Sequence, residues 1–248
     1  MHNFFVNSEA RTGDGFNITG KDYNHIKNVL RMSVGDIFLV SLENKSHLCE
    51  INRFEEGAVI AQIIEEDYKN TNLPIKIHLF QGLPKSDKME LIIQKAVELG
   101  ADRIIPTEMT NCVVKLDEKK KTSKTARWQS IAESAAKQSK RNSVPEVSLP
   151  LRFNEALTEA EKLDLILVPY ECEEGMKSTA EALKEIKSGM NIGIFIGAEG
   201  GFTDKEIDLC TKKGAKIISL GKRILRTETA AITAVGMCML YAEMNLEE

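Results

Sequence analysis

The sequence predicts an α/β protein with two domains, a small β-barrel at 1–70 followed by a parallel-sheet domain at 74–248. Short, closely spaced apolar runs fill the first seventy residues, as in a small barrel. The polar segment 65–74 ends in a proline and is typical of a linker. After it, apolar strand patterns alternate with helix patterns to the end of the chain, which is typical of a parallel sheet.

The first domain is expected to contain three strands and one helix. The strands are predicted at 37–40, 47–51 and 58–63, separated by turn residues. Asp22 is the expected cap of the helix, on which Tyr23, Ile26 and Leu30 share one face. The other side of this helix carries Lys21, Lys27 and Arg31. Considered alone, these basic residues are typical of a solvated helix face.

The second domain is expected to alternate five strands with five helices. Thr203 with Glu206, and Ser178 with Glu181, have the spacing of capping boxes that begin helices. The helix of 229–242 carries apolar residues on every side, which predicts burial. The expected strands are 75–80, 103–106, 163–168, 192–196 and 217–220, and the other expected helices include 87–99 and 124–140.

The overall composition restricts the class of protein. The chain has 248 residues and a formal net charge of −4, which argues against indiscriminate nucleic-acid binding but leaves room for a local basic face. Five scattered cysteines suit reduced thiols in a cytoplasmic protein. The four histidines have no metal-binding spacing, so no metal is expected. The longest uncharged run, 230–242, is too short to span a membrane.

Two stretches close in sequence, 197–203 and 220–229, carry the strongest functional signal. Each follows an apolar strand pattern and leads into a helix pattern. Gly197, Gly200 and Gly201 leave the first turn almost without side chains, so a ligand can approach its backbone donors. The spacing matches neither a phosphate-binding loop nor a dinucleotide fingerprint. A tight connection without a ligand is the alternative interpretation.

The segment 115–141 is locally basic and contains Trp128, the only tryptophan. Such a segment suits a phosphate backbone with unstacked bases. A lysine-rich surface loop followed by an amphipathic helix that buries Trp128 is the alternative. The strand ends at 168–170, 197–201 and 220–226 are expected to share one crevice, because open α/β sheets bind ligands at the carboxyl ends of their strands.

These residues resemble a known family. The matching segments are Gln81 to Glu90, 93–100, 136–146, 196–202 and 220–229. Together they resemble the ribosomal small-subunit methyltransferase E family of the SPOUT class, which methylates N3 of a uridine in 16S rRNA. The resemblance runs from Phe4 to the last helix. It implies an N-terminal PUA-like RNA-binding barrel and a trefoil-knotted domain that binds S-adenosylmethionine and forms a homodimer. The pattern alone predicts only an ordinary doubly wound sheet.

The resemblance also implies roles for individual residues in a cytoplasmic enzyme that acts on 16S rRNA in the 30S subunit. Arg226 is expected to stabilise the uracil or hold an RNA phosphate, and Glu199 or Glu228 to accept the N3 proton. The residues expected to bind the cofactor are Leu167, Val168, Pro169, Ile196, Gly197, Gly200, Gly201, Leu220, Gly221, Ile224, Leu225 and Thr229. The residues expected to bind RNA are Lys27, Arg31, Arg127, Lys137, Gln138 and Arg141. Thr227 and Thr229 have a second interpretation as caps of the last helix.

The chain departs from the family pattern at two positions. Ala198 stands where a proline is expected in the glycine turn, and Asn3 where an arginine often stands, which questions one RNA contact. Three other interpretations compete: a SPOUT enzyme acting on tRNA or a ribose, a non-catalytic RNA-binding assembly factor, and a metabolic α/β enzyme using a nucleotide. The intact glycine turn favours a cofactor-binding enzyme, and the basic segment favours RNA as its substrate.

Overall fold

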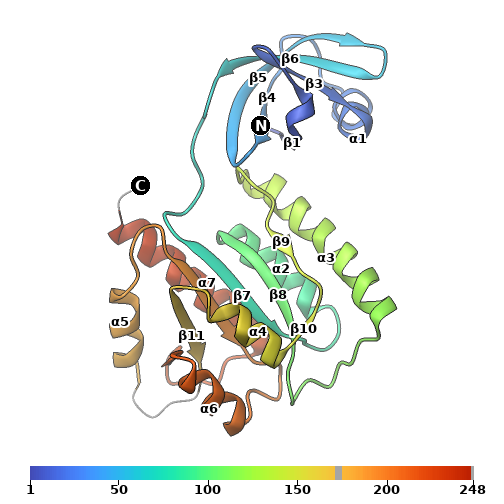
Figure 1. Cartoon of the computed structure of the whole chain (residues 1–248). Coiled ribbons are helices and arrows are strands. Elements are labelled where there is room, and N and C mark those ends of the chain that lie inside the picture. The colour runs from blue at the N-terminus through green and yellow to red at the C-terminus, as the bar shows by residue number, and fades with distance from the viewer. Residues whose placement is uncertain (171–174, 247–248) are drawn as a thin grey trace. The chain divides into compact units, whose positions relative to one another are not determined.

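The computed structural model describes residues 1–170 and 175–246. It divides into two compact units, one of Met1–Asn72 with Ala136–Val144, and one of Leu73–Ala135 with Pro145–Glu248 (Figure 1). The short segment Ala136–Val144 therefore belongs with the first unit, although it lies within the second part of the sequence. Of the five cysteines, Cys172 lies outside the described residues.

The first unit is built on one six-stranded sheet with the order β1-β4-β5-β6-β3-β2. Only β1 and β4 pair in parallel, and the other neighbours are antiparallel. The aromatic rings of Phe4, Phe16 and Phe38 lie in its apolar core. The elements are β1 (Asn3–Phe5), η1 (Ser8–Ala10), β2 (Arg11–Thr12), β3 (Gly15–Thr19), α1 (Gly20–Asn24), η2 (His25–Val29), β4 (Ile37–Leu42), β5 (Lys45–Glu55) and β6 (Ala58–Glu65).

The expected helix of the first unit is present, but its predicted cap is wrong. The chain forms one short α-helical segment, α1, which continues as the π-helix η2. The helix begins after Thr19, so Asp22 lies inside it. The Asp22 carboxylate instead forms an ion pair with the Lys137 ammonium at 3.4 Å. Three strands, β1 to β3, were not expected. The first two have only three and two residues, too few to show an alternation of apolar and polar residues. The third, β3, has five residues and was missed.

The second unit contains a seven-stranded sheet with the order β10-β8-β7-β12-β11-β13, and β9 pairs with β8. Every strand pair in it is parallel, as the alternation of patterns predicts. The carboxyl ends of β7, β12, β11 and β13 therefore lie side by side at one edge. The strands are β7 (Lys76–Gly82), β8 (Ala101–Glu108), β9 (Glu146–Val147), β10 (Leu151–Arg152), β11 (Leu165–Pro169), β12 (Asn191–Ile196) and β13 (Lys216–Ile218).

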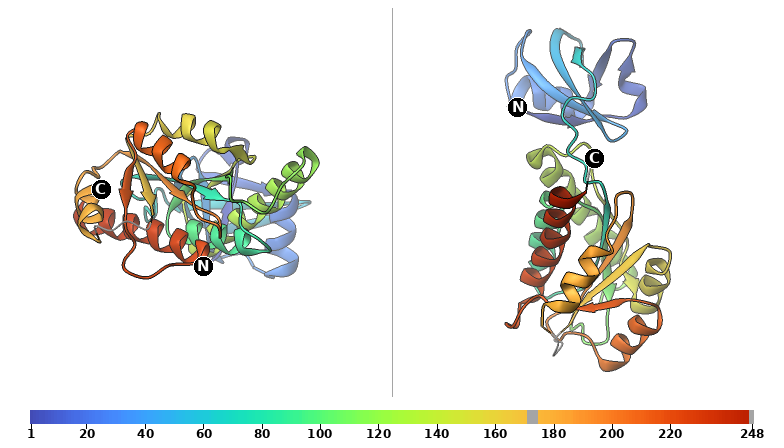
Figure 2. Two further views of the ribbon diagram at one scale, coloured as in Figure 1. Left: turned by 90° about the horizontal axis from the view of Figure 1, so that it is seen from below. Right: turned by 90° about the vertical axis from the view of Figure 1, so that its left-hand side faces the viewer.

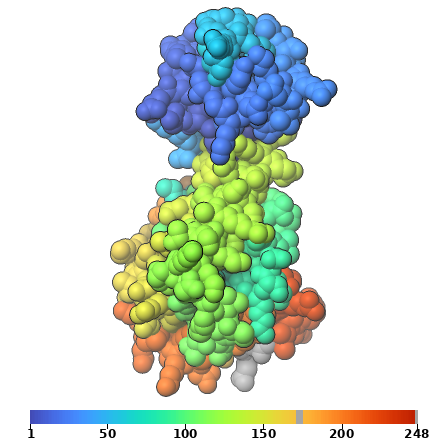
Figure 3. Space-filling model, turned by 90° about the vertical axis from the view of Figure 1, so that its right-hand side faces the viewer, coloured from blue at the N-terminus to red at the C-terminus, as the bar shows by residue number. Residues whose placement is uncertain are grey.

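Helices cover both faces of this sheet, with α2 and α7 on one side and α4 and α6 on the other (Figure 2). The rings of Phe80 and Phe195 stack at 4.4 Å between neighbouring strands in the core. The long helix α3 belongs to this unit up to Ala135, and its last four residues belong to the first unit (Figure 3, yellow-green). The helices are α2 (Lys88–Glu98), α3 (Glu118–Ser139), α4 (Phe153–Ala160), α5 (Lys177–Lys184), α6 (Asp204–Lys212) and α7 (Thr227–Asn245).

The two predicted capping boxes have different outcomes. Thr203 caps α6 and forms the full reciprocal box with Glu206, as expected. Helix α5 instead begins after Met176, and the buried hydroxyl of Ser178 has no hydrogen-bond partner among the described residues. The spacing of Ser178 and Glu181 was therefore misleading, because a capping box requires the serine to precede the helix.

Candidate functional site

A cavity of about 630 Å³ lies at the carboxyl edge of the sheet in the second unit. The strand ends at 169–170 and 196–202 and the loop at 219–227 line it together, as the sequence predicts. Among the expected site residues it brings together Pro169, Ile196, Gly197, Glu199, Gly200, Gly201, Leu220, Gly221, Ile224, Leu225 and Arg226. Its other lining residues are Lys88, Tyr170, Ala198, Phe202, Ser219, Arg223, Thr227 and Ala230.

The glycines of the turn after β12 are required by close packing. A Cβ on Gly197 would lie 3.1 Å from the backbone of Gly201, and a Cβ on Gly200 would lie 2.8 Å from Cβ of Asn111. Gly201 has a φ of 63°, a conformation that other residues rarely adopt. The Asn111 amide donates to the Gly200 carbonyl at 2.9 Å. The turn is thus held rigidly, with bare backbone facing the cavity.

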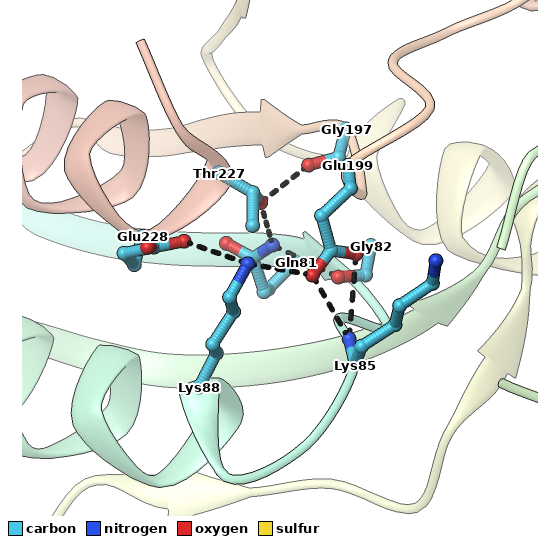
Figure 4. A network of polar contacts seen from close by, with 8 residues as sticks. All are labelled: Gln81, Gly82, Lys85, Lys88, Gly197, Glu199, Thr227 and Glu228. Carbon is cyan, nitrogen blue, oxygen red and sulfur yellow. Dashed lines mark hydrogen bonds and ion pairs between the residues drawn. The ribbon is translucent and has the colours of Figure 1, made fainter. Parts of the chain in front are cut away.

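The end of β7 packs directly against this turn. A Cβ on Gly82 would lie only 2.5 Å from the backbone nitrogen of Ala198, so no other residue fits there without moving the turn. Beside it, the Gln81 amide donates to the Thr227 hydroxyl at 2.9 Å, and that hydroxyl donates to the Gly197 carbonyl at 2.6 Å (Figure 4). This chain of hydrogen bonds joins the end of β7, the turn after β12 and the start of α7.

The hydrogen bonds of Thr227 correct the alternative capping interpretation. Helix α7 begins after Arg226, whose side chain makes no capping hydrogen bond. The Thr227 hydroxyl bonds to the turn rather than to its own helix, and it is buried. Thr229 is exposed on α7 outside the cavity lining, so neither threonine caps the helix.

A lysine links the two carboxylates that were expected to accept a proton. The Lys88 ammonium at the start of α2 lies 2.8 Å from Oε1 of Glu199 and 3.5 Å from Oε2 of Glu228 (Figure 4). The Glu199 carboxylate also accepts from the backbone N–H of Lys85, at 3.1 and 3.3 Å from its two oxygens. The Oε2 atom of Glu228 is buried and has no true hydrogen bond among the described residues, because 3.5 Å is the distance of a loose ion pair.

These contacts shift the pKa values of Glu199 and Lys88, which form the closer of the two ion pairs. Partial burial opposes ionisation of Glu199, but the hydrogen bonds from Lys88 and the Lys85 backbone outweigh it and hold the pKa of Glu199 below its usual value. The hydrogen bond to Glu199 raises the pKa of Lys88. Both groups are therefore charged at neutral pH, and Glu199 is a weak proton acceptor.

Four of the expected site residues lie away from the cavity, and Thr229 on the exposed side of α7 is one of them. Leu167 and Val168 are fully buried within β11, so only the end of that strand, at Pro169, reaches the lining. Glu228 belongs to α7 and contacts Lys88 from outside the lining. Sequence reasoning missed Lys88 and Gln81 as site residues, although both lie within the segment 81–90 that carries the family resemblance. Their partners are more than a hundred residues away, which no local pattern reveals.

The expected RNA-binding residues divide by exposure. Lys27, Arg31 and Gln138 of the first unit are exposed, whereas Lys137 is half-buried and paired with Asp22. Arg127 of the second unit is exposed and forms an ion pair with Glu90 at 2.7 Å.

Arg141 does not face solvent as the RNA-binding expectation requires, because it is 6% exposed within the first unit. Its backbone carbonyl accepts from the buried Asn3 amide at 3.0 Å, and Asn3 also accepts from the Ser41 hydroxyl at 3.0 Å. Asn3, which stands where an arginine is often found in the family, is thus part of an interior polar network rather than a surface contact.

Across residues 1–170 and 175–246, no three His, Cys, Asp or Glu side chains are grouped so that they could hold a metal ion. No helix in this part of the chain is long and apolar enough to cross a membrane.

Comparisons with known proteins agree with this architecture. The profile of an RNA methyltransferase domain matches residues 71–239, and that of an RNA methyltransferase PUA domain matches residues 18–64. The chain is 40% identical over 251 residues to the ribosomal RNA small subunit methyltransferase E of Bacillus subtilis, covering 98% of each chain. It is 34% identical over 241 residues to the protein of the same name from Mesomycoplasma hyopneumoniae, covering 96% of this chain and 99% of that one.

The fold is also similar to that of a solved relative. A ribosomal RNA small subunit methyltransferase E from Neisseria gonorrhoeae, crystallised with S-adenosyl methionine, superposes with a TM-score of 0.79 at 30% identity. The superposition covers 97% of each chain.

The ion pair of Glu199 and Lys88 predicts a pH-dependent contribution to stability. The folded-state pKa of Glu199 lies below its ordinary 4.5, so its contribution is full above that value and is lost as the pH falls through the folded-state pKa. The folded-state pKa of Lys88 lies above its ordinary 10.5, so its contribution is full below that value and is lost as the pH rises through the folded-state pKa. Urea unfolding of the wild type and of Glu199→Gln should differ most between these limits. An equal difference at every pH would contradict the assignment.

Proposed function

Since this chain belongs to the ribosomal RNA small subunit methyltransferase E family, we propose that it transfers a methyl group from S-adenosylmethionine to N3 of a uridine in 16S rRNA. The main structural support is the cavity at the carboxyl edge of the sheet, where the glycine turn and the loop 219–227 meet. The family membership supports methyl transfer to ribosomal RNA. The choice of uridine N3 as the acceptor rests on the resemblance of the motifs to those of the family.

The cavity suits a nucleoside cofactor. Its volume of about 630 Å³ lies within the range of small-molecule sites, roughly 300 to 1,000 Å³. Backbone groups at Gly197, Gly200 and Gly201 are free of side chains and suit the ribose and the edge of the adenine. Ile224 is 84% exposed and Leu225 lies beside it, so both offer apolar surface that a bound ring would cover. The cofactor supplies an electrophilic methyl group on a sulfonium.

Arg226 is the residue that we propose for the acceptor side. It precedes α7, is exposed, and lines the same cavity as the glycine turn. Uridine N3 carries a proton, so methylation requires that the negative charge left by its loss be stabilised. A guanidinium, which stays protonated, can stabilise the uracil as it becomes anionic or hold an RNA phosphate.

RNA contact is proposed for the exposed basic residues. Lys27 belongs to η2 of the first unit, Arg31 follows the end of that helix, and Arg127 belongs to α3 in the second unit. The protein carries a net charge of −4, so its affinity has to come from local basic patches rather than from a general field. A folded ribonucleoprotein presents phosphates at fixed positions, and binding to it avoids the entropic cost of ordering a flexible transcript.

We also propose a homodimer through the second unit. A groove of about 590 Å³ runs along α7 and is lined mainly by apolar side chains, with Leu99 and Leu183 at its border. Leu240 and Met244 of α7 are 51% and 73% exposed. An apolar helix face of this kind is typical of a surface that a partner subunit covers.

Substitution of Gly201 tests the cofactor site. Gly201→Val should abolish binding of S-adenosylmethionine, because the side chain would stand in the cavity and strain the turn. Gly214→Val is the matched control, since Gly214 also has a positive φ with open space around it but lies outside the lining. Isothermal titration calorimetry on both variants measures the effect. Binding by Gly201→Val with unchanged affinity would exclude the turn from the cofactor site.

Substitution of Leu240 tests the dimer. Leu240→Asp should convert the protein to a monomer, because it places a charge in the apolar groove. Leu209→Asp on α6 is the control, since Leu209 is an exposed leucine away from that groove. Light scattering at low micromolar concentration gives the masses. A wild type with only the monomer mass would refute the dimer.

Labelling of two substrates tests the target. The protein should methylate uridine N3 in 30S subunits that lack the modification faster than in free 16S rRNA. Joint substitution of Lys27 and Arg31 by alanine should weaken binding and reduce its salt dependence, because each lost phosphate contact lowers the slope by roughly one unit. Cofactor binding should be unchanged.

Methyl transfer from labelled cofactor gives the rate on each substrate, and mass spectrometry of the product nucleosides identifies the methylated nucleoside. Faster labelling of free rRNA would reject the preference for assembled subunits. Label on a ribose or a cytidine would reject the uridine assignment.

A further inference from the structure

Lys88 lies where three distant segments converge. It is the first residue of α2 and lines the cavity, Glu199 comes from the turn after β12, and Glu228 from the first turn of α7. Figure 4 shows the ammonium between the two carboxylates, beside Gln81 and Thr227. Among the lining residues, Lys88 is the single lysine. A fixed cation is therefore built into the wall of the cofactor cavity.

The two carboxylates hold Lys88 without using all of its hydrogen-bonding capacity. An ammonium has three N–H donors. In the described part of the chain, Glu199 accepts one of them at 2.8 Å, and Glu228 lies at the longer distance of 3.5 Å. At least one donor is thus available to a ligand in the cavity.

The carboxylates themselves are poorly placed to accept a proton from a substrate. Both oxygens of Glu199 are occupied, by Lys88 and by the Lys85 backbone. The Oε2 atom of Glu228 is buried, and Glu228 is absent from the cavity lining. Their geometry is that of supports for the ammonium.

Resting on the function proposed above, we propose that Lys88 is a catalytic residue that donates a hydrogen bond to a uracil carbonyl oxygen next to N3. Glu199 and Glu228 are then positioning residues that hold the ammonium in place. The carbonyl is neutral until the N3 proton leaves and then shares the negative charge, so the hydrogen bond strengthens as the reaction proceeds. The N-termini of α2 and α7, which begin at Lys88 and Thr227, add partial positive charge at the same place.

The cofactor carboxylate is the other acceptor that could reach Lys88. It would add a third full negative charge to a single ammonium that already faces Glu199 and Glu228. A neutral carbonyl adds none in the ground state. The charge balance therefore favours the uracil.

The step is balanced without a protein base. The N3–H bond breaks and its proton passes to hydroxide from solvent, which leaves the electron pair on N3. N3 then forms a bond to the methyl carbon, and the carbon–sulfur bond breaks with its electron pair staying on sulfur. Lys88 keeps its proton throughout. The products are a neutral thioether, a neutral N3-methyluridine and water.

Four variants test this assignment: Lys88→Met, Lys88→Arg, Glu199→Gln and, as a control, Lys212→Met on the exposed surface of α6. Single-turnover methylation of unmodified 30S subunits by Lys88→Met should fall by about 10²- to 10³-fold, as for loss of one donor to a developing oxyanion. Its affinity for S-adenosylmethionine in calorimetry should stay within about threefold of the wild type. Lys88→Arg should recover at least part of the rate, and Lys212→Met should behave as the wild type.

The pH profile separates Lys88 from a carboxylate base. The rate of Glu199→Gln should be lower than that of the wild type but should rise with pH in the same way, because solvent hydroxide takes the proton in both. A wild-type rate that is flat from neutral to alkaline pH, together with a Glu199→Gln rate that rises with pH, would show that Glu199 is the base and would overturn the assignment.

Other outcomes are equally decisive. If Lys88→Met loses about tenfold or more of its affinity for the cofactor, Lys88 contacts the cofactor rather than the uracil. If its methylation rate is unchanged, Lys88 has no role in the reaction. If Lys88→Met does not fold, full activity of Glu199→Gln would refute the role, because the ammonium would then need no carboxylate to hold it. A wild type that forms no N3-methyluridine would instead refute the proposed function.

Discussion

The close approach of β7 to the glycine turn after β12 is the constraint on which the site depends. The backbone of Gly82 lies so near Ala198 that even a methyl group would collide with it. This contact brings the segment 83–88 beside the turn, where Glu199 accepts from the Lys85 backbone. The Thr227 hydroxyl ties the start of α7 to the same turn. The cavity, the cation in its wall and the loop before α7 are all positioned by this one junction.

The junction explains why charged groups from distant segments lie together in the cavity wall. Lys88 is neutralised by carboxylates from two other segments, and the positive ends of two helices lie beside it. Transfer of a methyl group from a sulfonium requires alignment and stabilisation of the acceptor's charge more than a nucleophilic side chain. A rigid arrangement of backbone groups and paired charges meets those requirements.

Sequence patterns that span only a few neighbouring residues predicted the strands and helices well. The alternation of apolar runs predicts the parallel sheet, and the spacing of Thr203 and Glu206 predicts the start of α6. The same spacing fails at Ser178, because helix α5 begins at Lys177 and Ser178 lies inside it. The glycine turn predicts the cavity, but Lys88 reaches it across 111 residues of sequence. The Arg141 backbone likewise has a distant partner, because its carbonyl accepts from Asn3, 138 residues away. The trefoil knot implied by the family resemblance stays a prediction.

The most direct test of the central claim is a mass-spectrometric inventory of methylated uridines in 16S rRNA. The rRNA would come from cells with the gene, without it, and with the gene restored. One N3-methyluridine should be present with the gene, absent without it and recovered on restoration. The same inventory of methylated uridines in all three rRNA samples would contradict the proposed function.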